Sequence, residues 1–141
     1  QEAWKAVGIN ATPSPVDFGA VLVPAITENF NYTLAFLGFN WDVTGDQSAM
    51  FSSDQYKVGF NFMKYSNPEV DKLNKEANQT IDEAKRVDLL IESANLVNED
   101  LPVNVISFRK DRTAYQTRLH NFHPNALGGL LWSIPYVWVA Q

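Results

Sequence analysis

Residues 31–46 read NYTLAFLGFNWDVTGD, and this stretch gives the clearest indication of a fold. Residues 32–39 carry no charge and do not alternate between apolar and polar side chains. An uncharged run of this length predicts a β-strand that is covered on both faces, as in a parallel sheet packed between helices. Open α/β sheets bind ligands just beyond the carboxyl ends of their strands. The residues that follow this strand, 41–46, are therefore the first candidates for a binding site.

The segment before this strand completes a β-α-β pattern. Residues 9–12 form a short predicted strand, and Ser14-Pro15-Val16-Asp17 has the composition of a helix start, with serine as N-cap and proline at the first helical position. Pro24 lies inside this helix and is expected to kink or split it. A helical connection between two strands implies that the strands pair in parallel.

Two more helices and a third strand follow. Ser66-Asn67-Pro68-Glu69 starts a helix with the same capping chemistry, and Thr80-Ile81-Asp82-Glu83 matches a capping box for a longer helix that Pro102 ends. Residues 103–108 form the third predicted strand. The positions predicted to be buried are Val70, Leu73 and Ala77 in the first helix, and Ala84, Val87, Ile91, Ala94, Val97 and Leu101 in the second. The sequence thus predicts an α/β fold, a mostly parallel sheet flanked by helices.

Composition limits the class of protein. A chain of 141 residues is long enough for one domain with its own core. The net charge of −5 argues against a nucleic-acid partner, because phosphate binding needs a basic surface. The absence of cysteine excludes a disulfide scaffold and a thiolate metal site. The chain starts at Gln1 without a signal peptide, which is typical of a processed protein or of a piece of a longer one.

The order of several motifs carries a family resemblance. The motifs are Gly8-Ile9 after a short helix, the apolar strand ending in Trp41, Asn61, residues 65–73 (YSNPEVDKL), Arg86 in the long helix, and Glu99-Asp100-Leu101-Pro102 before a strand. Together they resemble the carboxyl-terminal lobe of the extracellular solute-binding proteins of family 5, the dipeptide-, oligopeptide- and nickel-type receptors of ABC importers. The resemblance covers about residues 4–122. It implies one lobe of a type II periplasmic-binding-protein-like receptor, with the second lobe outside this chain.

The resemblance also indicates where a solute binds. In peptide receptors of this family, an aspartate three residues after the tryptophan holds the amino group of the peptide. Thr44 stands at that position here, and acids stand at Asp42 and Asp46 instead. The family resemblance makes a peptide the first solute expected. The replacement of the aspartate by Thr44 makes a sugar the alternative. The residues expected at the ligand are Trp41, Asp42, Thr44, Asp46, Asn61 and Arg109.

Each of these residues also has a structural interpretation. A tryptophan at a strand end packs against a core as often as it faces a ligand, and the two loop acids stabilise turns through their side-chain oxygens. Asn61 is expected to order its own loop from beneath rather than to contact a solute. Arg109 is either a solvated charge at a strand end or a bidentate partner for a solute carboxylate.

The sequence predicts no enzyme, no cofactor and no metal site. It contains no Gly-x-Ser-x-Gly elbow, no His-Glu-x-x-His motif and no phosphate-binding glycine loop. His120 and His123 are three residues apart, but Pro124 follows them and no third ligand is evident, so they are interpreted as surface histidines.

The predicted function is solute capture for an ABC importer by closure of two lobes, without chemistry. Residues 1–118 are assigned to the lobe, and residues 119–141 to a segment that belongs to or contacts the second lobe. The expected partners are the solute, the second lobe and a membrane permease, in an extracellular or periplasmic location with a lipid anchor as one option. The alternative function is a small α/β interaction module that docks, or dimerises, through its aromatic carboxyl-terminal segment, residues 130–139.

Overall fold

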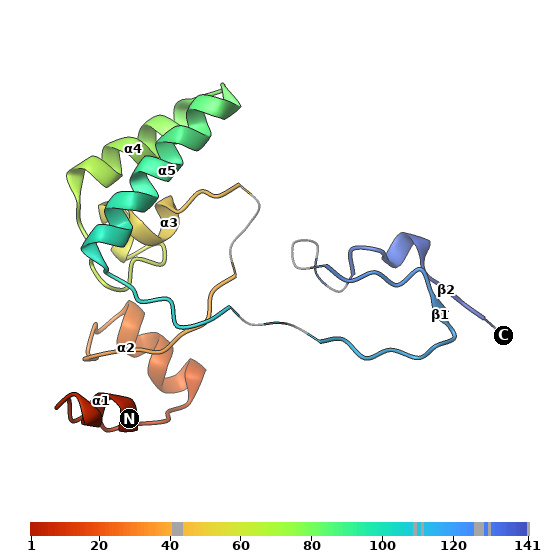
Figure 1. Ribbon diagram of the computed structural model, residues 1–141, viewed down its shortest axis with the longest axis horizontal. Coiled ribbons are helices and arrows are strands. Elements are labelled where there is room, and N and C mark those ends of the chain that lie inside the picture. Colours follow the sequence, from red (N-terminus) through yellow and green to blue (C-terminus); the bar gives the residue numbers. More distant parts are fainter. Residues whose placement is uncertain (41–43, 109, 111, 126–128, 130, 141) are drawn as a thin grey trace.

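The computed structural model describes residues 1–40, 44–108, 110, 112–125, 129 and 131–140. Most of its regular structure is helical (Figure 1). The elements in chain order are α1 (Glu2–Ala6), η1 (Phe18–Leu22), α2 (Val23–Thr27), α3 (Ser48–Phe51), η2 (Ser53–Tyr56), α4 (Pro68–Gln79), α5 (Glu83–Asp100), β1 (Leu119–His120), η3 (Ile134–Tyr136) and β2 (Trp138–Val139).

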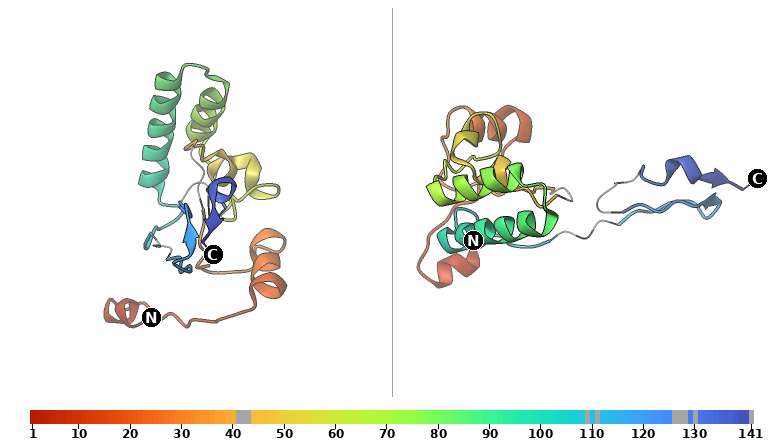
Figure 2. Two further views of the ribbon diagram at one scale, coloured as in Figure 1. Left: turned by 90° about the vertical axis from the view of Figure 1, so that its right-hand side faces the viewer. Right: turned by 90° about the horizontal axis from the view of Figure 1, so that it is seen from above.

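The largest helical unit is an antiparallel pair of long helices, α4 and α5, with α3 and η2 packed beneath them (Figure 1). This group is called the helical body below. Its core consists of Met50, Phe51, Val70 and Val97, with Met63, Tyr65, Leu96 and Val103 packed against them. The N-terminal helices lie beneath the body, and the chain after residue 108 leaves it as an extended segment that carries β1 and β2 (Figures 1 and 2).

Helix α4 begins as the sequence predicts. Asn67 is the N-cap, and its side-chain oxygen accepts a hydrogen bond of 3.0 Å from the Glu69 amide, with Pro68 in the first turn. The predicted stripe of Val70, Leu73 and Ala77 is buried, and the structure adds Asn74 to it. The burial of Asn74 was not predicted, because a polar amide side chain is expected at an exposed position of a helix.

The starts of two other helices differ from the prediction. The N-cap before η1 is Asp17, whose carboxylate accepts from the Ala20 amide at 2.6 Å, and not Ser14. The N-cap of α5 is Asp82, which accepts from the Lys85 amide at 2.8 Å. Thr80 instead ends α4, and its hydroxyl donates to the Glu76 carbonyl. In each case an aspartate closer to the helix supplies the cap, since a carboxylate also interacts favourably with the helix dipole.

Pro24 splits its helix as predicted. The turn before it is π-helical, and the α-helical turn α2 has Pro24 among its first residues. A proline has no amide hydrogen to donate to the preceding turn, so the hydrogen-bond pattern changes there. The Pro24 carbonyl remains an acceptor, and the Glu28 amide donates to it at 3.0 Å.

The buried face of α5 also differs from the prediction. The buried residues are Leu90, Ser93 and Val97, whereas Val87, Ile91 and Leu101 are exposed. Helix α5 has apolar residues on two faces, and the position of α4 decides which of the two is covered. The helical spacing of the sequence predicted that the stripe with the more regular apolar spacing is buried. Of the residues in that stripe, only Val97 is buried.

The predicted parallel sheet is not found among the described residues. Residues 9–12, 32–39 and 103–108 run without regular strand pairing, and the sheet that is described joins β1 and β2 in antiparallel order. A strand needs a hydrogen-bonded neighbour, and these three segments have none in regular register. Several of their large apolar side chains are instead exposed, such as Phe36 by 77% and Phe108 by 87% of their surface. An apolar composition therefore did not suffice to form strands in this chain.

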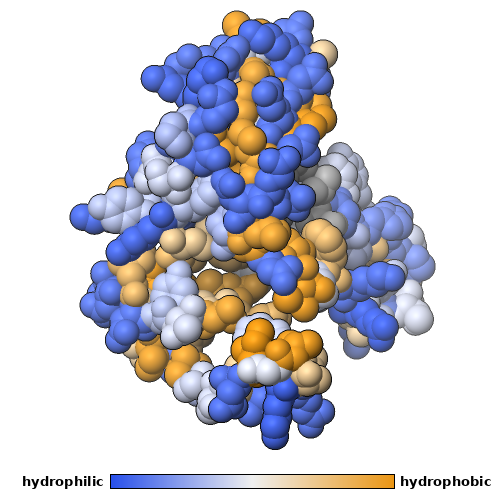
Figure 3. Space-filling model, turned by 60° about the vertical axis from the view of Figure 1, so that its left-hand side comes forward, coloured by the Kyte–Doolittle hydropathy of each residue, from blue (hydrophilic) through white to orange (hydrophobic). Residues whose placement is uncertain are grey.

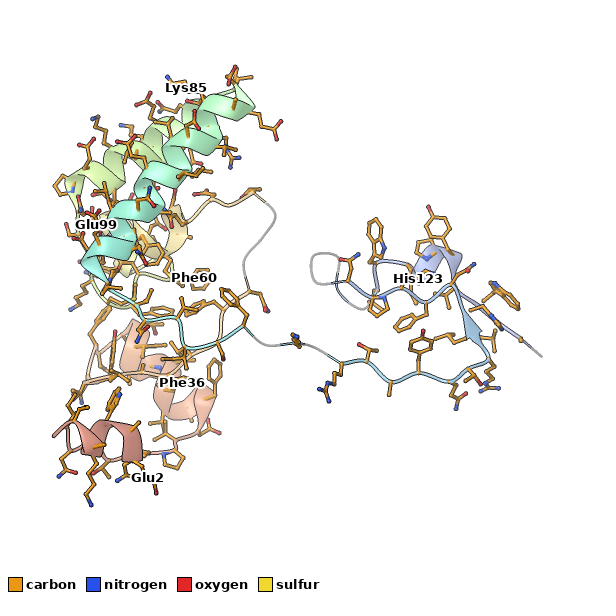
Figure 4. The ribbon with its side chains drawn as sticks, viewed as in Figure 1. Glu2, Phe36, Phe60, Lys85, Glu99 and His123 are labelled. Carbon is orange, nitrogen blue, oxygen red and sulfur yellow. The ribbon has the colours of Figure 1, made fainter. Side chains whose placement is uncertain are left out.

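The exposed apolar surface is extensive. Figure 3 shows apolar residues gathered around a hollow in the lower half of one face, beneath an upper half that is mostly hydrophilic. Phe60 lies just below the helical body, and Phe36 lies lower, near the N-terminal helices (Figure 4). Among the described residues, no helix is both long and apolar enough to cross a membrane.

Candidate ligand-binding loop

The loop that follows the 32–40 segment is folded by its own polar side chains. The Thr44 hydroxyl accepts from the Asp46 amide at 3.2 Å. Asp46 Oδ1 in turn accepts from the Ser48 amide at 2.9 Å and from the Ser48 hydroxyl at 2.6 Å. Two successive side-chain-to-backbone contacts of this kind form tight turns and lead directly into α3. Thr44 and Asp46 therefore shape the loop, and the structural interpretation of Asp46 as a turn residue is supported.

This loop lies against α5. The Arg86 guanidinium donates from Nη2 to the Thr44 carbonyl at 3.1 Å. Gly45 adopts the left-handed conformation, with φ of +68°, and packs towards Leu90. The Gln47 side chain donates from Nε2 to the Ser93 hydroxyl at 3.0 Å.

Behind the loop, a set of polar side chains crosses the helical body. It consists of Gln47, Ser93, Asn74 and Ser52, and is called the polar chain below. The Ser93 hydroxyl donates to Asn74 Oδ1 at 2.7 Å, and Asn74 Nδ2 donates to the Ser52 hydroxyl at 3.2 Å. Ser93 and Asn74 are almost fully buried, so these bonds are made away from water. The polar chain joins α3, α4 and α5 through their side chains.

Asn61 lies next to this chain and is fully buried. Its Nδ2 donates to the carbonyls of Ser52 and Tyr65 at 3.0 and 2.8 Å, and its Oδ1 accepts from the Tyr65 amide at 2.8 Å. Asn61 thus orders the 52–65 loop from inside, which is the role that the sequence favoured for it.

The end of the same loop is held by Tyr65 and Asp100. The Tyr65 phenol donates to Asp100 Oδ2 at 2.6 Å, and Asn67 Nδ2 donates to the same oxygen at 2.8 Å. Partial burial, followed by the bond to Asp100, raises the pKa of Tyr65 to about 12. The two donated hydrogen bonds lower the pKa of Asp100 below its ordinary value. Tyr32 is tied down similarly, since its phenol donates to the Phe62 carbonyl at 2.6 Å and burial raises its pKa.

An aromatic cluster joins the end of the 32–40 segment to the loop that Asn61 orders. The ring centroids of Phe39, Phe60 and Phe62 lie 6.1 to 6.2 Å from one another. Phe39 belongs to the end of the predicted strand, and the other two belong to the loop that Asn61 orders. Sequence reasoning missed this cluster because its members are separated in the chain, and Phe39 and Phe60 remain exposed.

A polar depression of about 390 Å³ lies between α3, η2 and α4. Its lining includes Asp71, which accepts from the Ser53 amide at 2.7 Å and from the Ser53 hydroxyl at 2.6 Å. Asn78 donates to the Ser48 hydroxyl at 3.0 Å across the same depression. These hydrogen bonds attach α3 and η2 to α4. The polar side chains of the depression therefore have a structural role.

The remaining predicted site residues have separate outcomes. Trp41, Asp42 and Arg109 lie outside the described residues. His120 stacks on Trp138 with ring centroids 4.1 Å apart, in the β1–β2 pair. Within the described residues, no group of three or more histidine, aspartate, glutamate or cysteine side chains is placed to hold a metal ion.

Comparison with known proteins adds an independent observation. The chain is 26% identical over 143 aligned positions to the oligopeptide-binding protein AppA of Bacillus subtilis (strain 168), and the alignment covers 100% of this chain. It is similar to peptide-binding proteins. A second relative, the di/tripeptide-binding protein 1 of Pseudomonas aeruginosa (strain UCBPP-PA14), is 25% identical over 91% of the chain. No protein-family model and no solved structure matches the chain.

The alignments cover only part of these relatives. The chain spans 26% of the length of the first and 24% of the second. Both relatives carry names of binding proteins rather than of enzymes. The similarity therefore supports a substrate-binding role, and it concerns about a quarter of each relative.

Proposed function

We propose that this chain is part of one lobe of a two-lobed receptor that captures short peptides for an ABC importer. The similarity of the whole chain to a protein named for oligopeptide binding carries this proposal. The relative of Pseudomonas aeruginosa, named for di- and tripeptides, supports the same class of solute. The receptor acts extracellularly or in the periplasm, with a membrane permease as its partner, and its mechanism is lobe closure around the solute without chemistry.

The loop from residue 41 to 47 provides the polar half of the proposed site. A peptide in water carries a cationic amino group, and a carboxylate is its natural partner. Thr44 occupies the position of the aspartate expected in peptide receptors, so Asp46, which is half-buried in the same loop, is proposed to bind the amino group. Trp41, Asp42 and Arg109 belong to the same proposed site.

The aromatic cluster provides the apolar half. Phe39 and Phe60 are exposed and pack against Phe62. Solute sites are mostly apolar walls with a few polar groups that set the orientation. The cluster is proposed to contact the side chains of the bound peptide. Apolar contacts of this kind do not require a particular peptide sequence.

The rest of the receptor is proposed to cover the exposed apolar segments. Residues 32–39 and 103–108 have the composition of buried strands, yet Leu34, Phe36, Ile106 and Phe108 are exposed in this chain. Because the relatives are about four times longer, they contain polypeptide that has no counterpart here. In the complete receptor these segments join a mostly parallel sheet. Residues 1–118 then form the lobe, and residues 119–141 reach the second lobe.

A calorimetric titration of the complete receptor with trialanine tests the function. The wild-type receptor is expected to bind, and Asp46→Asn is expected to lower the affinity by about tenfold or more, because a hydrogen bond to a charged group is worth about 1.5–3 kcal/mol. Asp54→Asn, at an exposed acid of η2, serves as the matched control. A receptor that binds no peptide contradicts the proposal. The 141-residue chain supplies half of a cleft, so tight binding of trialanine by this chain alone also contradicts it.

A second candidate function rests on the carboxyl-terminal segment. Leu131, Trp132, Ile134, Tyr136 and Trp138 are all exposed. A cluster of large exposed apolar residues is typical of a docking surface, so this segment is the candidate surface of an interaction module. Light scattering separates the two functions: a stable dimer of the 141-residue chain that Trp132→Ser and Tyr136→Ser dissociate favours the interaction module.

A further inference from the structure

The candidate loop contacts α5 at three points along one face of the helix. The Thr44 carbonyl accepts a hydrogen bond of 3.1 Å from the Arg86 guanidinium. The Gln47 side-chain amide donates a hydrogen bond of 3.0 Å to the Ser93 hydroxyl. Between them, a methyl group on Gly45 would lie 3.9 Å from Leu90 Cδ1, which is ordinary van der Waals distance. The loop therefore lies on the helix from residue 44 to residue 47.

The contacts follow the helical repeat of α5. Residues 86, 90 and 93 stand at i, i+4 and i+7, so they lie on one face of α5. The rise from 86 to 93 is about 10 Å in an α-helix, so the loop is held at points spread over about two turns of α5.

Ser93 is itself held in one orientation. A serine hydroxyl has a single hydrogen to donate, and that of Ser93 is directed to Asn74 Oδ1 at 2.7 Å. Its lone pairs then accept from Gln47 Nε2. Because Ser93 is fully buried and Asn74 nearly so, the position of Gln47 is set by two helices at once.

We propose that Arg86 and Ser93 are positioning residues that fix the 44–47 loop on α5 in the conformation that binds the ligand. Neither residue contacts the ligand in this proposal. The part that concerns the ligand rests on the proposed function, whereas the part that concerns the loop rests on the contacts described above.

Hydrogen exchange measured by mass spectrometry on the 141-residue chain tests the loop directly. Arg86→Ala and Gln47→Ala each remove one contact between the loop and α5, and Gln47→Ala does so without changing the sequence of α5. Exchange of the amides of residues 46–51 is expected to rise about fivefold in each variant, the factor that one ordinary hydrogen bond gives. Exchange in α4 is expected to stay unchanged. Lys85→Ala, which removes a neighbouring charge of the same sign, is the control. Unchanged exchange of residues 46–51 in both variants overturns the proposal.

A titration of the complete receptor with trialanine tests the ligand part. Arg86→Ala is expected to lower the affinity at least fivefold without lowering the Tm of the receptor, and Arg86→Lys is expected to restore most of it, since lysine also donates to a carbonyl. Faster loop exchange with unchanged affinity overturns the assignment as positioning residues. A wild-type receptor that binds no trialanine contradicts the peptide function alone, because the exchange result still decides whether the loop is fixed on α5.

Discussion

The Ser93 hydroxyl donates a hydrogen bond of 2.7 Å to Asn74 Oδ1 in the middle of the interface between α4 and α5. Both residues are almost completely buried. Each is also bonded further, Asn74 to Ser52 and Ser93 to Gln47. A polar pair of this kind fixes the register of two helices and links that register to the loops at either side.

Ser93→Ala is predicted to destabilise the chain by about 1–3 kcal/mol, because it leaves the buried Asn74 oxygen and the Gln47 amide without their partner. The free energy of unfolding in urea measures this. Asn95→Ala is the control, since it makes the same change to alanine at an exposed position of the same helix and is expected to be neutral within about 0.5 kcal/mol. Equal stability of the two variants would contradict the structural role of the pair.

Leu90 and Ile91 are neighbours with opposite environments, 8% and 54% exposed. In the 141-residue chain, Leu90→Ala is predicted to cost about 2–5 kcal/mol of unfolding free energy and Ile91→Ala less than about 1 kcal/mol. In the complete receptor, Ile91→Ala is predicted to become costly as well if the second apolar face of α5 is covered there. A larger loss from Ile91→Ala than from Leu90→Ala in the 141-residue chain would show that the faces are assigned the wrong way round.

Tyr65 and Asp100 predict how stability depends on pH. The pKa of Tyr65 is raised from 10.0 to about 12. Its contribution to the free energy of unfolding is therefore complete below pH 10.0 and is lost as the pH rises towards 12. The pKa of Asp100 is lowered from 3.8, so its contribution is complete above pH 3.8 and is lost as the pH falls further.

Tyr65→Phe is expected to reduce the loss of stability at both ends of this range, because it removes the hydrogen bond that the two groups share. Urea unfolding across the pH range measures this effect, and Tyr136→Phe, an exposed tyrosine, is the control. A pH profile that is identical in wild type and Tyr65→Phe would refute the assignment.

Gly59 is packed too closely to accept a side chain. A Cβ atom there would lie 2.6 Å from the Ala49 carbonyl oxygen and 2.6 Å from the Gln55 side-chain oxygen. Gly59→Ala is therefore predicted to lower the thermal unfolding midpoint, with a cost of about 1–3 kcal/mol. Gly38→Ala is the control, because no atom lies within 4 Å of the added methyl group. A similar midpoint for both variants would contradict the packing around Gly59.

The two long helices of the helical body, α4 and α5, were predictable from the sequence. The Asn67-Pro68 start of α4 and its stripe of Val70, Leu73 and Ala77 depend on local chemistry and on helical spacing, which the sequence contains. The buried face of α5 and the role of Ser93 depend on where α4 lies, which is a tertiary property. A serine in a helix looks solvent-exposed by sequence, and only its contact with Asn74 reveals its importance.

The strands were not predictable in the same way. Residues 32–39 have an apolar composition whether or not a neighbouring strand is present, but a sheet forms only with that neighbour. The loop of Thr44 and Asp46 follows this segment as the sequence implies, and its role as a ligand site stays a prediction. The contact of Arg86 with the Thr44 carbonyl joins positions 42 residues apart in the chain, so helical spacing did not predict it.

The most direct test of the peptide-receptor account is mass spectrometry of the molecules that the complete receptor retains when it is purified without denaturation. The account predicts a series of short-peptide masses, released on unfolding and reduced in amount by Asp46→Asn. A single sugar or another non-peptide solute in their place would contradict the account.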